Sequence, residues 1–234
     1  MAVLETSGSN PDVELLHDIN GLSDSTPRWL DQALGFVGEY GLLAAMVLLV
    51  LWCWVSVRRS ADPEGSVAAA IWAPLAAVGA VLVNMPIRGF VERPRPSADQ
   101  EGVTVLVDGA SSGYSFVSDH ATLAMALGVG LFVAHRKFGL VAIGLALVEG
   151  FLRVFIGAHY PTDVVGGFAL GTAVTLLLAP LAMAVLTRLT RVVSRSRRLA
   201  WLVRARRVAG AVELPEPRSA AAGASGPDEK DLAA

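Results

Sequence analysis

Two long stretches of the chain contain no Asp, Glu, Lys, Arg or His, and they limit the folds available to it. They cover residues 65–87 and 164–187. Each is longer than the ~20 residues with which a helix crosses the hydrocarbon layer of a bilayer. Because backbone groups inside that layer find no water, each segment must form its own hydrogen bonds, and we expect two membrane-spanning helices.

Three further segments are apolar but are interrupted by a few polar side chains. Residues 40–57 carry no charge and extend back to residue 36 across Glu39. Residues 119–135 are largely apolar after their first two positions, and residues 138–157 are interrupted by Glu149 and Arg153. We therefore predict an all-α, polytopic membrane helix bundle of about five spanning helices. The predicted helices lie near residues 36–57, 67–88, 119–135, 138–157 and 162–187.

The amino-acid composition supports a membrane protein. Hydrophobic residues make up 53% of the chain and charged residues 17%, whereas soluble domains carry about 25% charged residues. This balance excludes most soluble enzymes and a nucleic-acid-binding module. The single cysteine, Cys53, excludes an intrachain disulfide framework and a cluster of thiolate metal ligands.

The flanking segments differ in composition from the predicted bundle, which we place at residues 36–187. Residues 1–35 lack the apolar core of a signal peptide, so we expect them to stay attached as an extracytoplasmic or interfacial segment. Within them, residues 11–35 look amphipathic and predict either a helix lying in the interface or a solvated tail. Residues 188–212 are rich in arginine and predict a basic juxtamembrane helix. Residues 213–234 are rich in Ala, Pro, Gly and charge, which is typical of a disordered tail.

The positions of lysine and arginine predict the orientation of the helices. Short loops on the cytoplasmic side of a membrane carry an excess of these residues. They occur in pairs at 58–59 and 136–137 and recur after the fifth predicted helix. With five spans these positions share one side, so we expect a cytoplasmic C-terminus and extracytoplasmic loops at 89–118 and 157–162.

Charged and hydrogen-bonding side chains gather at the ends of the spans that face outward in this topology. Such residues are costly near a bilayer and are therefore functional candidates. They form four groups: Arg88, Arg93 and Arg95 after the second helix, Ser118, Asp119 and His120 at the start of the third, Arg153 near the end of the fourth, and His159 with Asp163 before the fifth.

This combination of residue types suits phosphate chemistry. Guanidinium groups offer paired donors that match phosphate oxygens, and the helix beginning near Ser118 can offer free backbone N–H groups. Two histidines suit nucleophilic and acid–base work near neutral pH. An Asp four residues after a His can accept the imidazole N–H and fix its tautomer. We infer phosphate chemistry on a substrate reached from the membrane.

Simpler roles for the same residues stay open. The arginines at 88–95 are also candidates for interfacial anchors, and Arg153 is a candidate partner of Glu149 one helical turn earlier. The residues that could make a metal site are His120, His159, Asp119 and Asp163. Because the neighbouring arginines would repel a divalent cation, we expect neither a metal nor another cofactor.

The spacing of these residues resembles that of a known family. The chain reads Arg88-x6-Arg95-Pro96, then Phe116-Val117-Ser118-Asp119-His120, and then Leu152-Arg153-x5-His159-x3-Asp163. It is similar to the type-2 phosphatidic acid phosphatase superfamily, whose motifs are Lys-x6-Arg-Pro, Pro-Ser-Gly-His and Ser-Arg-x5-His-x3-Asp. Three positions depart from these motifs: Arg88 for Lys, Val117 for Pro and Leu152 for Ser.

The bacterial undecaprenyl-diphosphatase branch, of the bacitracin-resistance type, resembles the chain more closely. In the second motif that branch has Asp where the wider superfamily has Gly, as at Asp119. It also resembles the chain at Ile19-Asn20-Gly21, Glu39-Tyr40-Gly41 and Asn84.

The resemblance implies a role for each site residue. His159 would attack the terminal phosphorus and form a phosphohistidine, and Asp163 would orient it. His120 would protonate the leaving group and later activate water. The predicted phosphate-binding residues are Arg88, Arg95, Arg153, Ser118 and Asp119.

The resemblance also implies a substrate and a place in the cell. A polyprenyl diphosphate, undecaprenyl or decaprenyl, would be cleaved to the monophosphate at the outer face of the cell membrane, which recycles the cell-wall lipid carrier. The expected partners are this lipid and the bilayer, with no nucleic acid. Two alternatives stay open: a phosphatase of phosphatidic acid or phosphatidylglycerol phosphate, and a non-catalytic lipid-phosphate binding protein.

Overall fold

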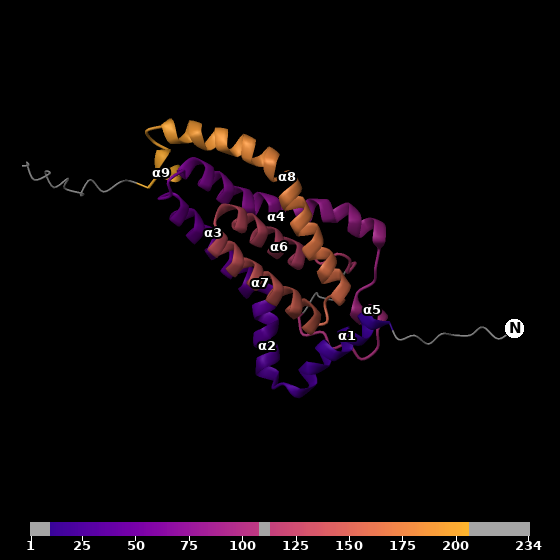
Figure 1. The fold of residues 1–234 in the computed structure, drawn as a ribbon. Coiled ribbons are helices and arrows are strands. Elements are labelled where there is room, and N and C mark those ends of the chain that lie inside the picture. The colour runs from indigo at the N-terminus through magenta and orange to yellow at the C-terminus, as the bar shows by residue number, and fades with distance from the viewer. Residues whose placement is uncertain (1–9, 108–112, 206–234) are drawn as a thin grey trace, which may run out of the picture.

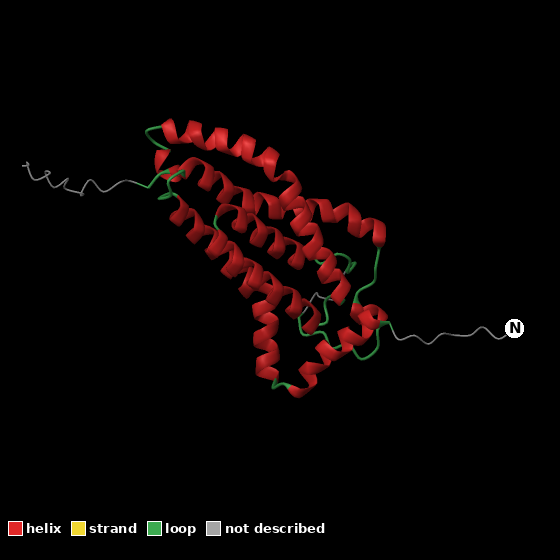
Figure 2. Ribbon diagram, viewed as in Figure 1, coloured by secondary structure: helices red, strands yellow, loops and turns green. Residues whose placement is uncertain are grey.

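The computed structural model describes residues 10–107 and 113–205, and every regular element in these parts is helical (Figures 1 and 2). The predicted all-α bundle is therefore confirmed. The elements are α1 (Pro11–Asn20), the 3₁₀ turn η1 (Gly21–Ser25), α2 (Arg28–Phe36), the π-helical segment η2 (Val37–Gly41), α3 (Leu42–Val57), α4 (Pro63–Val91), α5 (Pro96–Asp99), α6 (Asp119–Ala134), α7 (Arg136–Phe155), α8 (Pro161–Arg195) and α9 (Ala200–Val203).

Four helical runs in the described residues are long and apolar enough to cross a membrane, and the protein is a multi-pass membrane protein. They are Arg28–Val57, Pro63–Asp99, Arg136–Phe155 and Pro161–Arg195. The third predicted span, near 119–135, corresponds to α6, which has only 16 residues and therefore a length of about 24 Å. It lies in the middle of the bundle, where α4, α7 and α8 pack around it (Figure 1).

Small residues allow α6 to sit at the centre. A Cβ atom added to Gly171 of α8 would collide with the backbone carbonyl of Thr122, and one added to Gly130 of α6 would collide with Ala73 of α4. Membrane helices that approach this closely need such residues, because backbone contact replaces side-chain packing. The close approach fixes the start of α6, which carries His120, against the start of α8.

Helix α8 is bent, and its second half lies along α4 (Figure 1); the helix contains an internal proline, Pro180. Proline inside a helix removes one backbone hydrogen bond and clashes with the preceding turn, which explains the bend. Residues 188–195, predicted to belong to a separate basic helix, continue α8 instead. The helix ends at Arg195, and the short helix α9 follows at Ala200–Val203. Residues 206–212 of the predicted basic helix and the predicted tail at 213–234 lie outside the described residues.

The segment at 11–35 forms two helices rather than one. Helix α1 folds back beneath one end of the bundle, whereas α2 continues through η2 into α3 without a break at residue 36 (Figure 1). The side chain of Asn20 fastens the end of α1, because its amide nitrogen donates to the carbonyls of Thr104 and Phe155, each at 2.8 Å.

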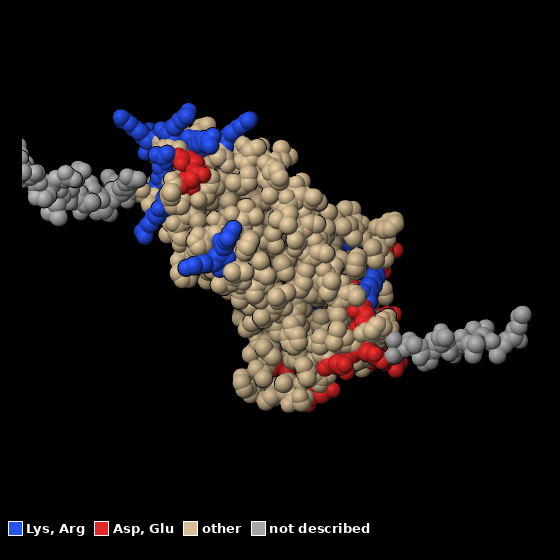
Figure 3. Space-filling view, viewed as in Figure 1, with Lys and Arg blue, Asp and Glu red and all other residues tan. Residues whose placement is uncertain are grey.

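The two ends of the bundle differ in charge (Figure 3). Lysine and arginine gather at the end formed by α9 and the C-terminal half of α8. Acidic side chains gather at the opposite end, around α1. The predicted site residues belong to this second end.

Candidate active site

The third motif is built on the end of α7. Gly157 has a left-handed φ of 74°, and its N–H donates to the carbonyl of Val154 at 3.0 Å. The N–H of Ala158 donates to the carbonyl of Arg153 at 3.1 Å. These two bonds form a Schellman cap. The N–H of His159 donates to the same Arg153 carbonyl at 3.2 Å, so the spacing between Arg and His in the motif follows from the geometry of a helix end.

The start of α8 explains the remaining spacing of the motif. Tyr160 is the N-cap residue and Pro161 the first helical residue, a position that proline favours. The carboxylate of Asp163, in the third helical position, accepts the backbone N–H of Tyr160 at 2.9 Å. His159 is therefore held in a short turn between two capped helix ends.

His159 is only 3% exposed, and its Nδ1 lies 2.8 Å from the carbonyl oxygen of Ser115. A carbonyl oxygen only accepts, so Nδ1 carries the proton and Nε2 keeps a free lone pair. The hydrogen bond that the sequence predicts between His159 and Asp163 is replaced by this one, since Oδ2 of Asp163 lies 3.8 Å from Nδ1. Burial lowers the pKa of His159 below its ordinary value, which favours the neutral ring.

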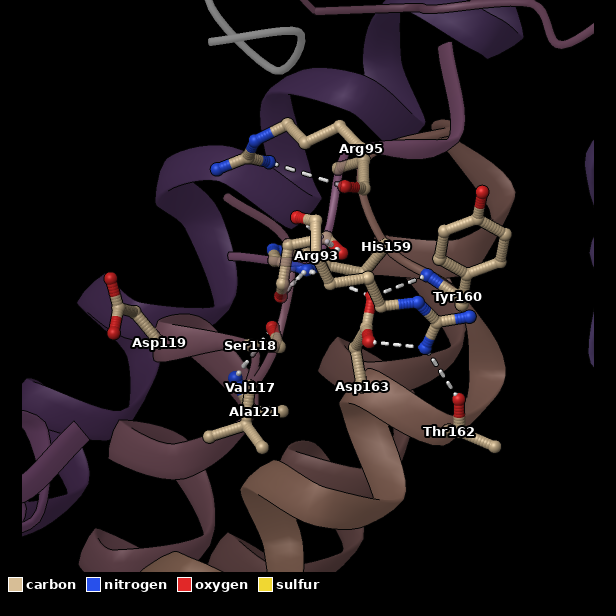
Figure 4. Close-up of polar contacts among 12 residues, drawn as sticks. Arg93, Arg95, Val117, Ser118, Asp119, Ala121, His159, Tyr160, Thr162 and Asp163 are labelled. Carbon is tan, nitrogen blue, oxygen red and sulfur yellow. Dashed lines mark hydrogen bonds and ion pairs between the residues drawn. The ribbon is translucent and has the colours of Figure 1, made fainter. Parts of the chain in front are cut away.

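Arg93, whose role the sequence left undefined, holds the Asp163 carboxylate (Figure 4). Its Nη1 donates to Oδ1 of Asp163 at 2.7 Å and to the hydroxyl of Thr162 at 2.8 Å. The guanidinium lies over the ring of Tyr160, 3.8 Å from its centroid. Asp163 is fully buried, so Arg93 supplies the opposite charge that a buried carboxylate requires.

The second motif begins α6 beside this turn. The Ser118 hydroxyl accepts the N–H of Ala121 at 3.4 Å as the helix N-cap. The backbone N–H of Ser118 donates to the carbonyl of Asp163 at 3.1 Å. His120 lies in the first turn of α6.

Asp119 belongs to the opposite side of the site, where α4 holds it. Its carboxylate forms an ion pair with Arg88 and accepts the side-chain amide of Asn84 at 2.6 Å. Asn84 also donates to the carbonyl of Val117 at 2.9 Å. The predicted phosphate ligands Arg88 and Asp119 are thus bound to each other, and the side chain of Asp119 points away from the contacts around Asp163 (Figure 4).

The three predicted phosphate-binding arginines come together at this end of the bundle. Arg88 and Arg153 lie close enough to Arg95 for their positive charges to act on it. Arg95 donates to the carbonyl of Ala158 at 3.1 Å, beside His159. The predicted partner of Arg153, Glu149, lies 3.7 Å away. A carboxylate that the sequence did not assign to Arg153, that of Glu39, is closer at 2.6 Å.

In the described parts of the chain, no group of three or more His, Cys, Asp and Glu side chains is arranged to hold a metal ion. The chemistry available to the site's own residues is that of a neutral imidazole nitrogen beside converging guanidinium groups. This arrangement suits transfer of a phosphoryl group, whose oxygens need positive charge in the transition state.

The fold and this site together define an integral membrane phosphatase of lipid phosphates. Residues 68–186 match the PAP2 superfamily, and the chain belongs to that superfamily. It is 28% identical over 165 residues to the undecaprenyl-diphosphatase BcrC of Bacillus subtilis, which covers 70% of this chain and 80% of that one. It is 30% identical over 143 residues to the bacitracin transport permease protein BcrC of Bacillus licheniformis, covering 61% of this chain and 66% of that one.

A solved structure has a similar fold. The crystal structure of the first transmembrane PAP2-type phosphatidylglycerolphosphate phosphatase from Bacillus subtilis superposes with a TM-score of 0.55. The two chains are 23% identical, and the superposition covers 75% of this chain and 86% of the other. The family match begins within α4 and therefore leaves α1, α2 and α3 outside it.

Proposed function

We propose that the protein hydrolyses a polyprenyl diphosphate to the monophosphate and inorganic phosphate through a phosphohistidine at His159. The observation that carries the proposal is the 2.8 Å contact between Nδ1 of His159 and the Ser115 carbonyl. A carbonyl oxygen only accepts hydrogen bonds, so this contact supports a proton on Nδ1 and a free lone pair on Nε2 for the proposed attack.

In the first proposed step, Nε2 of His159 forms a bond to the terminal phosphorus. The bond from that phosphorus to the bridging oxygen breaks, and the electron pair stays with the lipid phosphate, to which His120 gives a proton. In the second step His120 takes a proton from water, whose oxygen attacks the phosphohistidine. Inorganic phosphate leaves, and both histidines return to their first state.

Arg88, Arg95 and Arg153 are proposed to hold the phosphoryl oxygens in both steps. Charge on these oxygens is greatest in the transition state, and a fixed donor in such a site contributes about 3–4 kcal/mol. The Ser118 hydroxyl and the backbone N–H groups at the start of α6 complete the proposed oxyanion site.

The diphosphate is favoured as substrate by Asp119 and by the name of the Bacillus subtilis relative, an undecaprenyl-diphosphatase. The charge distribution of the bundle supports an outward-facing site. Because arginine and lysine gather at the other end (Figure 3), the rule that positive loops stay inside favours an extracytoplasmic position for His159.

A lipid monophosphate is the second candidate substrate. The fold neighbour from Bacillus subtilis is a phosphatidylglycerolphosphate phosphatase, and the same arginines and histidines would serve a monoester.

The test is phosphate release by the purified protein in detergent with EDTA present. Polyprenyl diphosphate, phosphatidylglycerol phosphate and phosphatidic acid are compared, each with the wild type and His159→Ala. We expect release from the diphosphate by the wild type and none by the variant. Preference for a monoester would replace the substrate but keep the mechanism. Normal turnover by His159→Ala would refute the mechanism, and binding without release by the wild type would favour a lipid-phosphate binding protein.

A further inference from the structure

The carboxylate of Asp12, on the N-terminal helix α1, reaches the start of α8. Its Oδ1 accepts the backbone N–H of Thr162 at 2.9 Å, and its Oδ2 accepts the Thr162 hydroxyl at 2.6 Å. Oδ2 also accepts Nη2 of Arg93 at 2.6 Å. Asp12 therefore binds Arg93, which holds the Asp163 carboxylate, and Thr162, which precedes Asp163 in the chain. Figure 4 shows Arg93 and Thr162 beside Asp163.

Arg93 joins the two carboxylates. Its Nη2 binds Asp12 and its Nη1 binds Asp163, while the flat face of the guanidinium rests on Tyr160. A planar guanidinium that is held at its two terminal nitrogens and on one face has little freedom to rotate.

Helix α1 is fixed against the catalytic turn at more than this point. Leu16, one turn after Asp12, is fully buried in a cluster with Val154, Tyr160 and Val164. At the end of α1, the side chain of Asn20 binds the backbone of Thr104 and Phe155. The carboxylate of Asp12 therefore approaches Arg93 from a helix whose position is set independently.

We propose that Asp12 is a positioning residue of the active site, which fixes Asp163 and the start of α8 through Arg93 and Thr162. Helix α1 then belongs to the catalytic apparatus, although it lies outside the residues 68–186 that match the family. The inference rests on the proposed function, because it gives His159 the role of nucleophile and Asp163 that of its neighbouring acid.

The test compares Asp12→Asn with Glu14→Gln, which removes an exposed carboxylate from the same helix. Turnover of polyprenyl diphosphate is measured in detergent, and kcat and KM are separated. We expect Asp12→Asn to lower kcat about tenfold or more, because small displacements of reacting groups cost roughly this much or more. KM should stay within about twofold, since Asp12 contacts other protein groups and not the phosphate-binding arginines 88, 95 and 153. Asp12→Glu should recover part of the lost kcat, and Glu14→Gln should match the wild type.

A second readout follows the chemical step alone. In a rapid-quench experiment with labelled diphosphate, Asp12→Asn should slow formation of the phosphoenzyme by the same factor as kcat. Thr162→Val removes only the hydroxyl link to Asp12 and Arg93 and should give a smaller decrease. If Asp12→Asn fails to fold, as judged by its elution and thermal midpoint, the Thr162→Val result decides the question.

Three outcomes would overturn the inference: an unchanged kcat in Asp12→Asn, a change confined to KM, or an unchanged rate of phosphoenzyme formation in Thr162→Val. The proposed function is judged separately by His159→Ala in the same assay. An inactive His159→Ala with a normal Asp12→Asn removes only the role of Asp12. An active His159→Ala removes the mechanism on which both proposals rest.

Discussion

Replacing Gly157 by Ala should damage the turn that carries His159, through two separate effects. The first is the backbone, because φ at this position is 74° and a side chain there costs about 1 kcal/mol or slightly more. The second is a collision, because the new Cβ would lie 2.6 Å from the carbonyl oxygen of Thr104. That carbonyl is itself held by Asn20, so it has little freedom to move away.

The two effects have different sizes. Forcing an extra carbon into a packed site costs about 1–3 kcal/mol, so the total for Gly157→Ala is about 2–4 kcal/mol. In a chain of this length, 1 kcal/mol lowers the thermal midpoint by about 2–4 °C. We therefore expect a decrease of roughly 4–16 °C, together with a loss of kcat, since the collision displaces the backbone next to His159.

Two other glycines separate the effects. Gly102 has a φ of 78° but nothing within 4 Å of an added Cβ, so Gly102→Ala carries the backbone cost without the collision. Gly144 lies in α7 with open space and no unusual φ, so Gly144→Ala should be neutral or slightly stabilising. The assay is the thermal midpoint of each purified variant in the same detergent, with kcat measured below the lowest midpoint.

The expected order of destabilisation is Gly157→Ala, then Gly102→Ala, then Gly144→Ala. Equal midpoints for Gly157→Ala and Gly102→Ala would refute the collision with Thr104. A normal kcat in a destabilised Gly157→Ala would show that the Schellman turn stabilises the fold without setting the position of His159.

Three further expectations concern protonation, buried charge and hydrogen bonding. Because burial lowers the pKa of His159 and the neutral ring is the proposed nucleophile, protonation of His159 should lower kcat/KM only below pH 6.5; a pH–rate profile whose acid limb lies at or above pH 6.5 would contradict this. Glu39→Gln should lower the free energy of unfolding by up to about 3 kcal/mol and lower the thermal midpoint more than Glu149→Gln. Glu39 is the closer partner of buried Arg153, whereas the Glu149 carboxylate makes no hydrogen bond; equal midpoints would count against this. Asn84→Ala should cost about 1–3 kcal/mol by leaving a buried backbone carbonyl unpaired, and an unchanged midpoint would show that another donor replaces the amide.

Local patterns in the sequence predicted the bundle and much of the site. The charge-free stretches at 65–87 and 164–187 fall inside α4 and α8, because hydrophobicity over this length has few other structural solutions. The spacing from Arg153 to Asp163 is also a local property, since it is set by a helix end followed by a capped helix start. Such features depend on neighbouring residues, which a single sequence displays.

The missed contacts depend on residues far apart in the chain. Asp12 and Thr162 are 150 positions apart, and no periodicity in either segment indicates that they meet. The acceptor for His159 is a backbone carbonyl, that of Ser115, which has no signature in the side-chain pattern. The π-helical segment η2 delivers Glu39 to Arg153, although nothing distinguishes its residues from an ordinary helical turn. Arg93 was singled out beforehand as one of the outward-facing arginines, and Glu39 as part of the family resemblance, but no partner for either was apparent from the sequence.

The distant carboxylates explain how the bundle holds several guanidinium groups together before a phosphate binds. Like charges at this end would repel one another, and each buried guanidinium would be costly without a partner. Arg88 pairs with Asp119, Arg93 with Asp12 and Asp163, and Arg153 with Glu39. A guanidinium has five N–H donors, so Arg88 and Arg153 can each keep a carboxylate and still donate to a phosphoryl oxygen. The carboxylates thus lower the cost of assembling the cationic site, and they leave N–H donors for the proposed contacts with the phosphate.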